Sequence, residues 1–270
     1  MASAVSNLKS AGGGNERFNA EAASWDSRPF VHAASREAAD AILAQLKTHS
    51  LHKATNDLNV LEIGCGTGIL SFLLAPHVQR VVAVDAAEGM IDVLNQKLHK
   101  PNAPSNITPV AVLLENPEDP ALPPARPQGS DASGDATARL KFDLITSHLV
   151  LHHIPDLAPV LRTMHGCLKN GGSVMLTDFQ DFAPEARRFH PESKMDGVAR
   201  HGIQVEQMTQ LMRDAGFAGV EVKTAWRMMK TVEKFPGEFG TKGGPGEGQG
   251  EEMEIPFVMC YGQKPGQMLC

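Results

Sequence analysis

A glycine-rich turn is the part of the chain whose residues and spacing point most directly to chemistry. Residues 62–68 read Glu-Ile-Gly-Cys-Gly-Thr-Gly, with glycine at positions 64, 66 and 68. Glycines at alternate positions let the backbone turn sharply and approach a ligand more closely than a Cβ would allow. The helix expected to follow begins with free backbone N–H groups. The segment therefore predicts a ligand-binding turn.

Two details separate this turn from the dinucleotide-binding turn, which it otherwise resembles. In a G-x-G-x-x-G pattern the third glycine would be residue 69, which is Ile69 here, so the pyrophosphate fingerprint is incomplete. Glu62 lies two residues before the first glycine, where its carboxylate can bond to turn amides or to a cationic ligand. Both details argue against a pyrophosphate as the ligand.

A second acidic residue, Asp85, follows the next apolar segment of the chain. A carboxylate at the end of that strand can accept hydrogen bonds from both hydroxyls of a ribose. Asp85 can also be the N-cap of a helix that starts near Ala87, and this role does not exclude the first. The position suits a nucleoside cofactor.

Apolar segments of strand length alternate with helical patterns around these residues. The predicted strands are Asn59–Ile63, Val81–Val84, Val110–Leu114, Phe142–Thr146, Ser173–Thr177, Val220–Trp226 and Pro256–Gly262. The predicted helices after the glycine turn cover residues 69–75, the segment through Met90 and Leu98, residues 157–168 and residues 205–215. A turn at Lys169–Gly172 follows the third of these helices. This alternation predicts a parallel sheet built from βαβ units.

The composition of the flanking segments predicts how the chain is organised. Residues 1–14 are expected to form a disordered tail, residues 15–50 an N-terminal helical cap, and residues 51–265 the main domain. Segments near 123–139 and 236–252 are rich in Pro, Gly, Ser and charge without apolar periodicity, and we expect them to be flexible insertions.

Composition and charge exclude several classes of protein. The formal net charge is −6, with Lys and Arg scattered, so we expect no nucleic-acid partner. No stretch approaches the roughly 18 apolar residues of a membrane span, and we expect a cytoplasmic protein with no membrane partner. The cysteines Cys65, Cys167, Cys260 and Cys270 form no C-x-x-C pair and have no histidine at ligand spacing, so neither a disulfide nor a zinc site is predicted.

Four segments together resemble the class I S-adenosylmethionine-dependent methyltransferases. Residues 60–68 (VLEIGCGTG) resemble motif I of that family, and residues 84–90 (VDAAEGM) resemble the motif after it. Residues 142–156 (FDLITSHLVLHHIPD) look like the fourth strand and loop of its UbiE/COQ5-like, small-molecule branch, and residues 169–176 like the turn and strand that follow. The segments occur in the family's order and spacing, and residues 18–26 (FNAEAASWD) resemble the entry of that branch.

The resemblance implies S-adenosyl-L-methionine as the cofactor and a role for each matching position. Gly64, Gly66 and the neighbouring backbone of Cys65, Thr67 and Gly68 would line its methionine part, with Glu62 near the ammonium group. Asp85 would hold the ribose, while Ala86 and Met90 would flank the adenine, although Met90 can equally be helix core. Glu115 or Asn116 would bond the adenine amino group, in a sequence that departs from the usual Asp, and Ser147 and His148 would face cofactor and substrate.

Five histidines are candidates for a general base. Methyl transfer from a sulfonium is an in-line displacement that needs mainly positioning, but an acceptor of high pKa benefits from a base, and histidine suits neutral pH. The candidates are His148, His152, His153, His190 and His201, although a single histidine is more often a hydrogen-bonded structural residue than a base. His152, His153 and Asp156 give only a faint metal-ligand pattern, so no metal is predicted.

The sequence therefore predicts an α/β fold with a Rossmann-like, seven-stranded, mostly parallel sheet, helices on both faces and a C-terminal antiparallel strand. The predicted function is methyl transfer from S-adenosyl-L-methionine to a small organic acceptor with an oxygen, nitrogen, carbon or sulfur nucleophile. Two alternatives stay open: a catalytically silent relative that regulates a partner, and an NAD-linked oxidoreductase. The identity of the acceptor and the oligomeric state do not follow from the residues.

Overall fold

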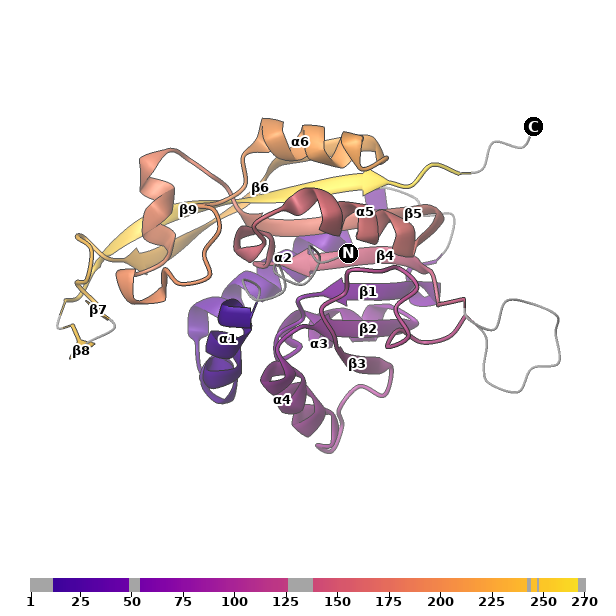
Figure 1. Cartoon of the computed structure of the whole chain (residues 1–270), viewed down its shortest axis with the longest axis horizontal. Helices are drawn as coiled ribbons and strands as arrows, with labels where there is room; N and C mark the ends of the chain where they lie inside the picture. The colour runs from indigo at the N-terminus through magenta and orange to yellow at the C-terminus, as the bar shows by residue number, and fades with distance from the viewer. Residues whose placement is uncertain (1–11, 49–53, 126–137, 242–243, 247, 267–270) are drawn as a thin grey trace, which may run out of the picture.

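The computed structural model describes residues 12–48, 54–125, 138–241, 244–246 and 248–266 (Figure 1). Its helices are α1 (Gly12–Trp25), α2 (Pro29–Thr48), α3 (Ile69–Leu74), α4 (Glu88–Leu98), α5 (Leu157–Cys167) and α6 (Val205–Asp214). Its strands are β1 (Asn59–Ile63), β2 (Arg80–Asp85), β3 (Ile107–Ala111), β4 (Phe142–His148), β5 (Leu168–Phe179), β6 (Ala218–Val232), β7 (Gly240–Thr241), β8 (Gly244–Pro245) and β9 (Glu251–Gln263). Its short 3₁₀ helices include η3 (Leu151–His153), which follows β4, and η4 (Pro184–Phe189), which follows β5.

Seven of the strands form one sheet in the order β3-β2-β1-β4-β5-β9-β6. Strands β1 to β5 pair in parallel, and β9 runs antiparallel to both β5 and β6. The predicted fold class, including the C-terminal antiparallel strand, is confirmed. The order reverses between β1 and β4, and open α/β sheets bind ligands outside the carboxyl ends of the strands at such a switch point.

Helices cover both faces of the sheet because neighbouring strand residues point to opposite sides. Leu61 belongs to a core cluster with Leu161 of α5 and Met208 of α6. Val60 belongs to the cluster on the other face, with Ile42 of α2 and residues of α3 and α4. The central strands are thus buried on both sides, as in other parallel sheets.

Strands β3 and β5 both begin earlier in the chain than the sequence suggests. Strand β3 covers Ile107–Ala111 rather than Val110–Leu114, because its register with β2 ends where Asp85 pairs with Ala111. Strand β5 begins at Leu168, immediately after α5, so the predicted turn at residues 169–172 is an irregularity within the strand. Gly171 has φ +80° there, a conformation that favours glycine.

The last two strands form a longer hairpin than the predicted segments Val220–Trp226 and Pro256–Gly262. Pairing runs from Ala218 with Gln263 to Val232 with Glu251 (Figure 1). The extension is stabilised by cross-strand contacts such as Arg227 with Glu254 at 3.2 Å. Part of the segment near 236–252, predicted to be a flexible insertion, therefore belongs to β7, β8 and β9.

The remaining predictions of organisation concern the ends of the chain and the first insertion. The predicted tail lies largely outside the described residues, as does most of the insertion near 123–139, while α1 and α2 occupy the range of the predicted helical cap. Within the described part of the chain, no helix has both the length and the hydropathy that crossing a membrane requires.

Candidate functional site

A cavity of about 740 Å³ lies at the carboxyl ends of β1, β2 and β4. This volume is in the range of about 300–1,000 Å³ that is usual for small-molecule sites. Its walls come from α1 and α2, the turn after β1, the end of β2, the segment after β3, the segment after β4, α5 and residues 197–199. Segments far apart in the sequence therefore meet around one space.

The glycine turn forms one wall of the cavity. Gly64, Gly66 and Gly68 have φ angles of +75°, +53° and +80°. A Cβ on Gly64 would lie 2.4 Å from a methyl of Val150, and one on Gly68 would lie 2.5 Å from a methyl of Leu94. A Cβ on Gly66 would meet nothing closer than Trp25 Nε1, at 3.9 Å. Packing thus requires glycine at two positions, whereas Gly66 leaves space beside the cavity.

Asp85 connects the end of β2 to this turn. Its Oδ2 accepts a hydrogen bond from the Gly66 N–H at 2.7 Å, and its Oδ1 accepts one from the Ala87 N–H at 2.8 Å. Burial raises the pKa of Asp85, while the hydrogen bonds from Ala87 and Gly66 act in the opposite direction. The side chain also lines the cavity. Asp85 therefore contacts the segment before α4 and also faces the cavity, but the prediction that Asp85 is the N-cap was wrong, because Ala87 is the N-cap of α4.

Glu62 is a buried carboxyl group on the same wall. Its side chain is 2% exposed and accepts a hydrogen bond from the Ser71 hydroxyl. Burial raises the pKa of Glu62 to about 8, and the neighbouring Asp85 adds to the shift. At neutral pH the group is mainly protonated, and a cation placed beside it would favour its ionised form.

Helix α1 closes the cavity from the N-terminal side. Phe18 and Trp25 both line the cavity, and their rings meet edge to face with centroids 5.8 Å apart. Asp26, directly after the helix, accepts hydrogen bonds from the Thr67 hydroxyl and from Lys97 Nζ, the latter at 2.7 Å. These contacts hold the end of α1 against the glycine turn.

Ten of the thirteen residues predicted to bind a cofactor line the cavity: Glu62, Gly64, Cys65, Gly66, Thr67, Asp85, Ala86, Met90, Glu115 and His148. The other three lie outside it. Gly68 is the N-cap of α3, and the Asn116 side chain accepts a hydrogen bond from the Glu118 N–H at 2.9 Å. The buried Ser147 hydroxyl donates to the Ile63 carbonyl at 2.8 Å.

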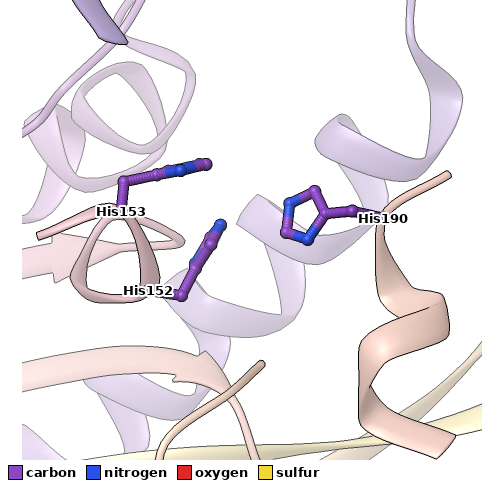
Figure 2. Close-up of side chains that lie close together, drawn as sticks. All are labelled: His152, His153 and His190. Carbon is purple, nitrogen blue, oxygen red and sulfur yellow. The ribbon is translucent and has the colours of Figure 1, made fainter. Parts of the chain in front are cut away.

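Two of the five candidate histidines, His148 and His153, line the cavity. Burial lowers the pKa of His148 to about 4 and that of His153 to about 3, so both are neutral at neutral pH. His152 and His190 lie beside His153 without lining the cavity, with ring centroids 3.9 Å and 5.7 Å from it (Figure 2). His201 joins neither group.

The sequence predictions missed several residues that the fold brings to this region. Asp178, near the end of β5, is fully buried and accepts a hydrogen bond from His152 Nδ1 at 2.8 Å. Gly197, Val198 and Ala199 also line the cavity. An acidic residue directly after an apolar strand was a signal that could have identified Asp178, but no pattern marks residues 197–199.

Residues 30–222 match a family model described as a methyltransferase domain. The chain is 28% identical over 169 residues to an uncharacterized methyltransferase of Schizosaccharomyces pombe, which covers 61% of this chain and 55% of the relative. It is 33% identical over 118 residues to a ubiquinone biosynthesis O-methyltransferase of Pseudomonas aeruginosa, covering 44% of this chain and 43% of the relative. The chain thus spans about half the length of the curated relatives it matches.

Solved structures share the fold. The YcgJ protein from Bacillus subtilis superposes with a TM-score of 0.58 at 16% identity, covering 84% of this chain and 98% of that chain. The DhpI–SAH complex superposes with a TM-score of 0.54 at 17% identity, covering 94% of this chain and 96% of that chain. At these identities the similarity is one of fold.

Proposed function

Because the chain belongs to the S-adenosylmethionine-dependent methyltransferases of class I, whose domain model matches residues 30–222, we propose that it transfers a methyl group to a small organic acceptor. The observation that carries the proposal is the geometry of Gly66. Its N–H is bonded to Asp85, and the space where its Cβ would lie is open beside the cavity. A nucleoside can therefore approach the turn backbone while Asp85 lies within the same wall.

The residues around the cavity fit this cofactor chemically. S-adenosyl-L-methionine carries a sulfonium and an ammonium group, and two carboxyl groups, the buried Glu62 and the half-buried Asp85, line the cavity. We assign the turn backbone to the methionine part, with Glu62 near the ammonium, and Asp85 to the ribose. Ala86 and Met90 would flank the adenine. The two candidates to bond the adenine amino group are Glu115 and Asn116. Glu115 lines the cavity, so we assign this hydrogen bond to Glu115.

The remaining part of the cavity suits a small acceptor. Phe18 and Trp25 of α1, together with Leu149 and Val198, supply apolar walls that exclude water from the reacting groups. When bound, the sulfonium supplies a methyl group that is already activated for displacement. The protein then has to hold the acceptor in line with it, and such positioning supplies much of the catalysis.

His148 and His153 are suited to hydrogen bonding with the acceptor rather than to full proton removal. Both line the cavity, and burial keeps both neutral at neutral pH. A neutral imidazole whose conjugate acid has a low pKa is a weak base, and efficient general bases have pKa values near the working pH. These histidines would orient an acceptor that is nucleophilic already or is activated by another group.

The similarity to a ubiquinone biosynthesis O-methyltransferase over 44% of this chain supports including phenols among the acceptors to be tested. Assignment to the UbiE/COQ5-like branch, a cytoplasmic location and the absence of nucleic-acid partners stay predictions from the sequence.

Two measurements on the full chain test the proposal. Calorimetric titration with S-adenosylhomocysteine should show binding at one site, and a panel of phenols, amines and thiols should yield a methylated product with S-adenosylmethionine. Binding without turnover on a broad panel would favour a catalytically silent relative. Absence of binding, or thermal protection by NADH alone, would overturn the proposal.

A further inference from the structure

Three histidine side chains converge beside the cavity. His152 and His153 belong to η3, after β4, and His190 directly follows η4. One ring nitrogen from each lies within 4.8 Å of the other two. Figure 2 shows the three rings pointing toward one another from these two segments. Two short segments that lie on either side of β5 in the sequence thus bring three imidazole rings together.

Two of the rings are oriented by hydrogen bonds at their far side. His152 Nδ1 lies 2.8 Å from one carboxylate oxygen of Asp178 and 3.0 Å from the other. His153 Nδ1 lies 2.8 Å from the carbonyl oxygen of Gly197, to which it donates. Histidines that bind metals almost always donate their second N–H to a carboxylate or a backbone carbonyl in this way. Both rings therefore keep Nε2 free for a ligand.

The free nitrogens are not satisfied within the described part of the chain. His152 is 2% exposed, and its Nε2 has no hydrogen-bond partner there. The buried Nδ1 of His190 also has none among the described residues. A buried polar atom without a partner costs free energy. Two such atoms in one cluster point to a ligand that accepts lone pairs from nitrogen.

Two of the three side chains are kept in the neutral form that binds metal. Burial lowers the pKa of His153 to about 3, and burial with the neighbouring histidines lowers the pKa of His190 as well. Neutral imidazole is the ligand form. Asp178 places a carboxylate behind His152, while the positive charges of Arg17 and Lys230 also lower the pKa of His190 and oppose a cation.

We propose that His152, His153 and His190 bind one divalent transition-metal ion of the zinc class. Three imidazoles suit zinc, copper, iron or nickel rather than magnesium or calcium. A three-histidine set leaves a fourth position open, as in catalytic zinc sites. Zinc–nitrogen bonds of about 2.0–2.1 Å place tetrahedral ligands roughly 3.4 Å apart, so the rings would move slightly inward on binding. The sequence did not predict this site, because His190 is remote from the other two.

The place of the site connects it to the proposed function. His153 lines the cavity, and its ring meets Phe18 edge to face at 5.1 Å. The metal would therefore lie beside the part of the cavity that we assign to the acceptor, and this connection rests on the proposed methyl transfer. A metal ion lowers the pKa of a bound hydroxyl or thiol, an activation that the two cavity histidines supply poorly.

Cobalt(II) titration of the chelator-treated, full-length protein tests the metal site. We expect one equivalent of Co²⁺ to bind, with the visible absorption of a four-coordinate ion, and Zn²⁺ to displace it. His153→Asn and His190→Asn should each weaken binding by at least about tenfold, and Asp178→Asn by about 10- to 100-fold. His77→Asn, at an exposed position remote from the cluster in the sequence, is the matched control and should bind as the wild type does.

The circular dichroism and thermal unfolding of each variant show that a loss of binding is not a loss of fold. Zn²⁺ should raise the Tm of the wild type and of His77→Asn but not that of His190→Asn. Absence of stoichiometric Co²⁺ binding in the wild type, or equal affinity in a folded His190→Asn variant, would overturn the proposal. S-adenosylhomocysteine titration of the same samples keeps the outcomes separate: cofactor binding without Co²⁺ binding rejects the metal site alone, and Co²⁺ binding without cofactor binding supports the metal site while rejecting the proposed methyl transfer.

Discussion

The carboxylate of Asp85 accepts the backbone N–H of Gly66, with 2.7 Å between Oδ2 and the nitrogen. This bond joins the tip of β2 to the turn after β1. The other carboxylate oxygen accepts the N–H of Ala87, immediately before α4. One side chain thus aligns the turn and the helix that border the cavity.

Asp85→Ala should therefore weaken S-adenosylhomocysteine binding by about 1–3 kcal/mol, through loss of the proposed ribose bonds and of the bond that positions Gly66. Calorimetric titration measures the effect. Asp92→Ala, at an exposed position of α4, is the control and should leave the Kd unchanged. A wild-type Kd in a folded Asp85→Ala protein would remove this residue from the binding site.

Substitutions at two of the turn glycines should have different consequences. Gly66→Ala should fold with a loss of about 1–2 kcal/mol from its positive φ, and should lose cofactor binding because the new methyl group occupies open space beside the cavity. Gly64→Ala should lower the free energy of unfolding further, since its Cβ would lie 2.4 Å from a Val150 methyl. Urea denaturation and titration of both variants test this contrast. Equal stabilities of the two, or normal binding by Gly66→Ala, would contradict it.

The contact between Asp26 and Lys97 should control the mobility of α1. Burial acts to raise the pKa of Asp26, but the hydrogen bonds from Lys97 and Thr67 prevail and lower it below 3.8. Asp26→Asn should increase amide exchange in α1 and weaken cofactor binding by roughly 3- to 10-fold, with a small effect on global stability because the Asp26 carboxylate is 34% exposed and screened by solvent. The same loosening should appear in the wild type as the pH falls through the lowered pKa.

Hydrogen–deuterium exchange and calorimetry measure both effects. Asp40→Asn, at an exposed position of α2, supplies the comparison. Unchanged exchange in α1 after Asp26→Asn would show that other contacts hold the helix.

Glu62 should make stability depend on pH. Its pKa rises from 4.5 to about 8 on folding, so the folded state retains a proton that the unfolded state has lost, and stability falls as the pH rises across this interval. Glu62→Gln removes the titration and should keep the hydrogen bond from Ser71. We expect the variant to gain up to about 5 kcal/mol relative to the wild type as the pH rises from 4.5 to about 8. Urea unfolding of both proteins at several pH values checks this; parallel curves would be inconsistent with a raised pKa.

The fold was predictable from the sequence to the extent that local patterns determine it. Apolar runs of strand length identified the seven strands, and their alternation with helices predicted parallel pairing. Strand β3 was misplaced because the apolar run continues into Val112 and Leu113, which leave the sheet and line the cavity. An apolar residue that lines a cavity and one that is buried in a sheet produce the same local pattern.

The candidate site was predictable where it consists of consecutive residues. The turn at 62–68 and Asp85 gave clear signals, since a glycine conformation and a strand end are local features. The contact between His190 and His152 depends on how the segments after β4 and β5 fold toward each other. The contact between Asp178 and His152 depends on the same arrangement. Sequence spacing contains no information about that arrangement, so the five histidines could only be predicted as separate candidates.

The attachment of α1 has a further consequence for how the protein exchanges its small molecules. Helix α1 takes no part in the strand pairing of the sheet. Besides the contacts of Asp26, it is held by a hydrogen bond from the Gly89 N–H to the Asn19 side chain and by one from Arg17 to the Lys194 carbonyl, each 2.8 Å long. Undocking this segment exposes one apolar cluster, in which Ala22, Phe18 and Trp25 pack against residues such as Met90, and it disrupts no strand pairing. Undocking of α1 therefore requires far less free energy than unfolding of the whole domain. It would open the cavity to solvent, so that a spent nucleoside can leave.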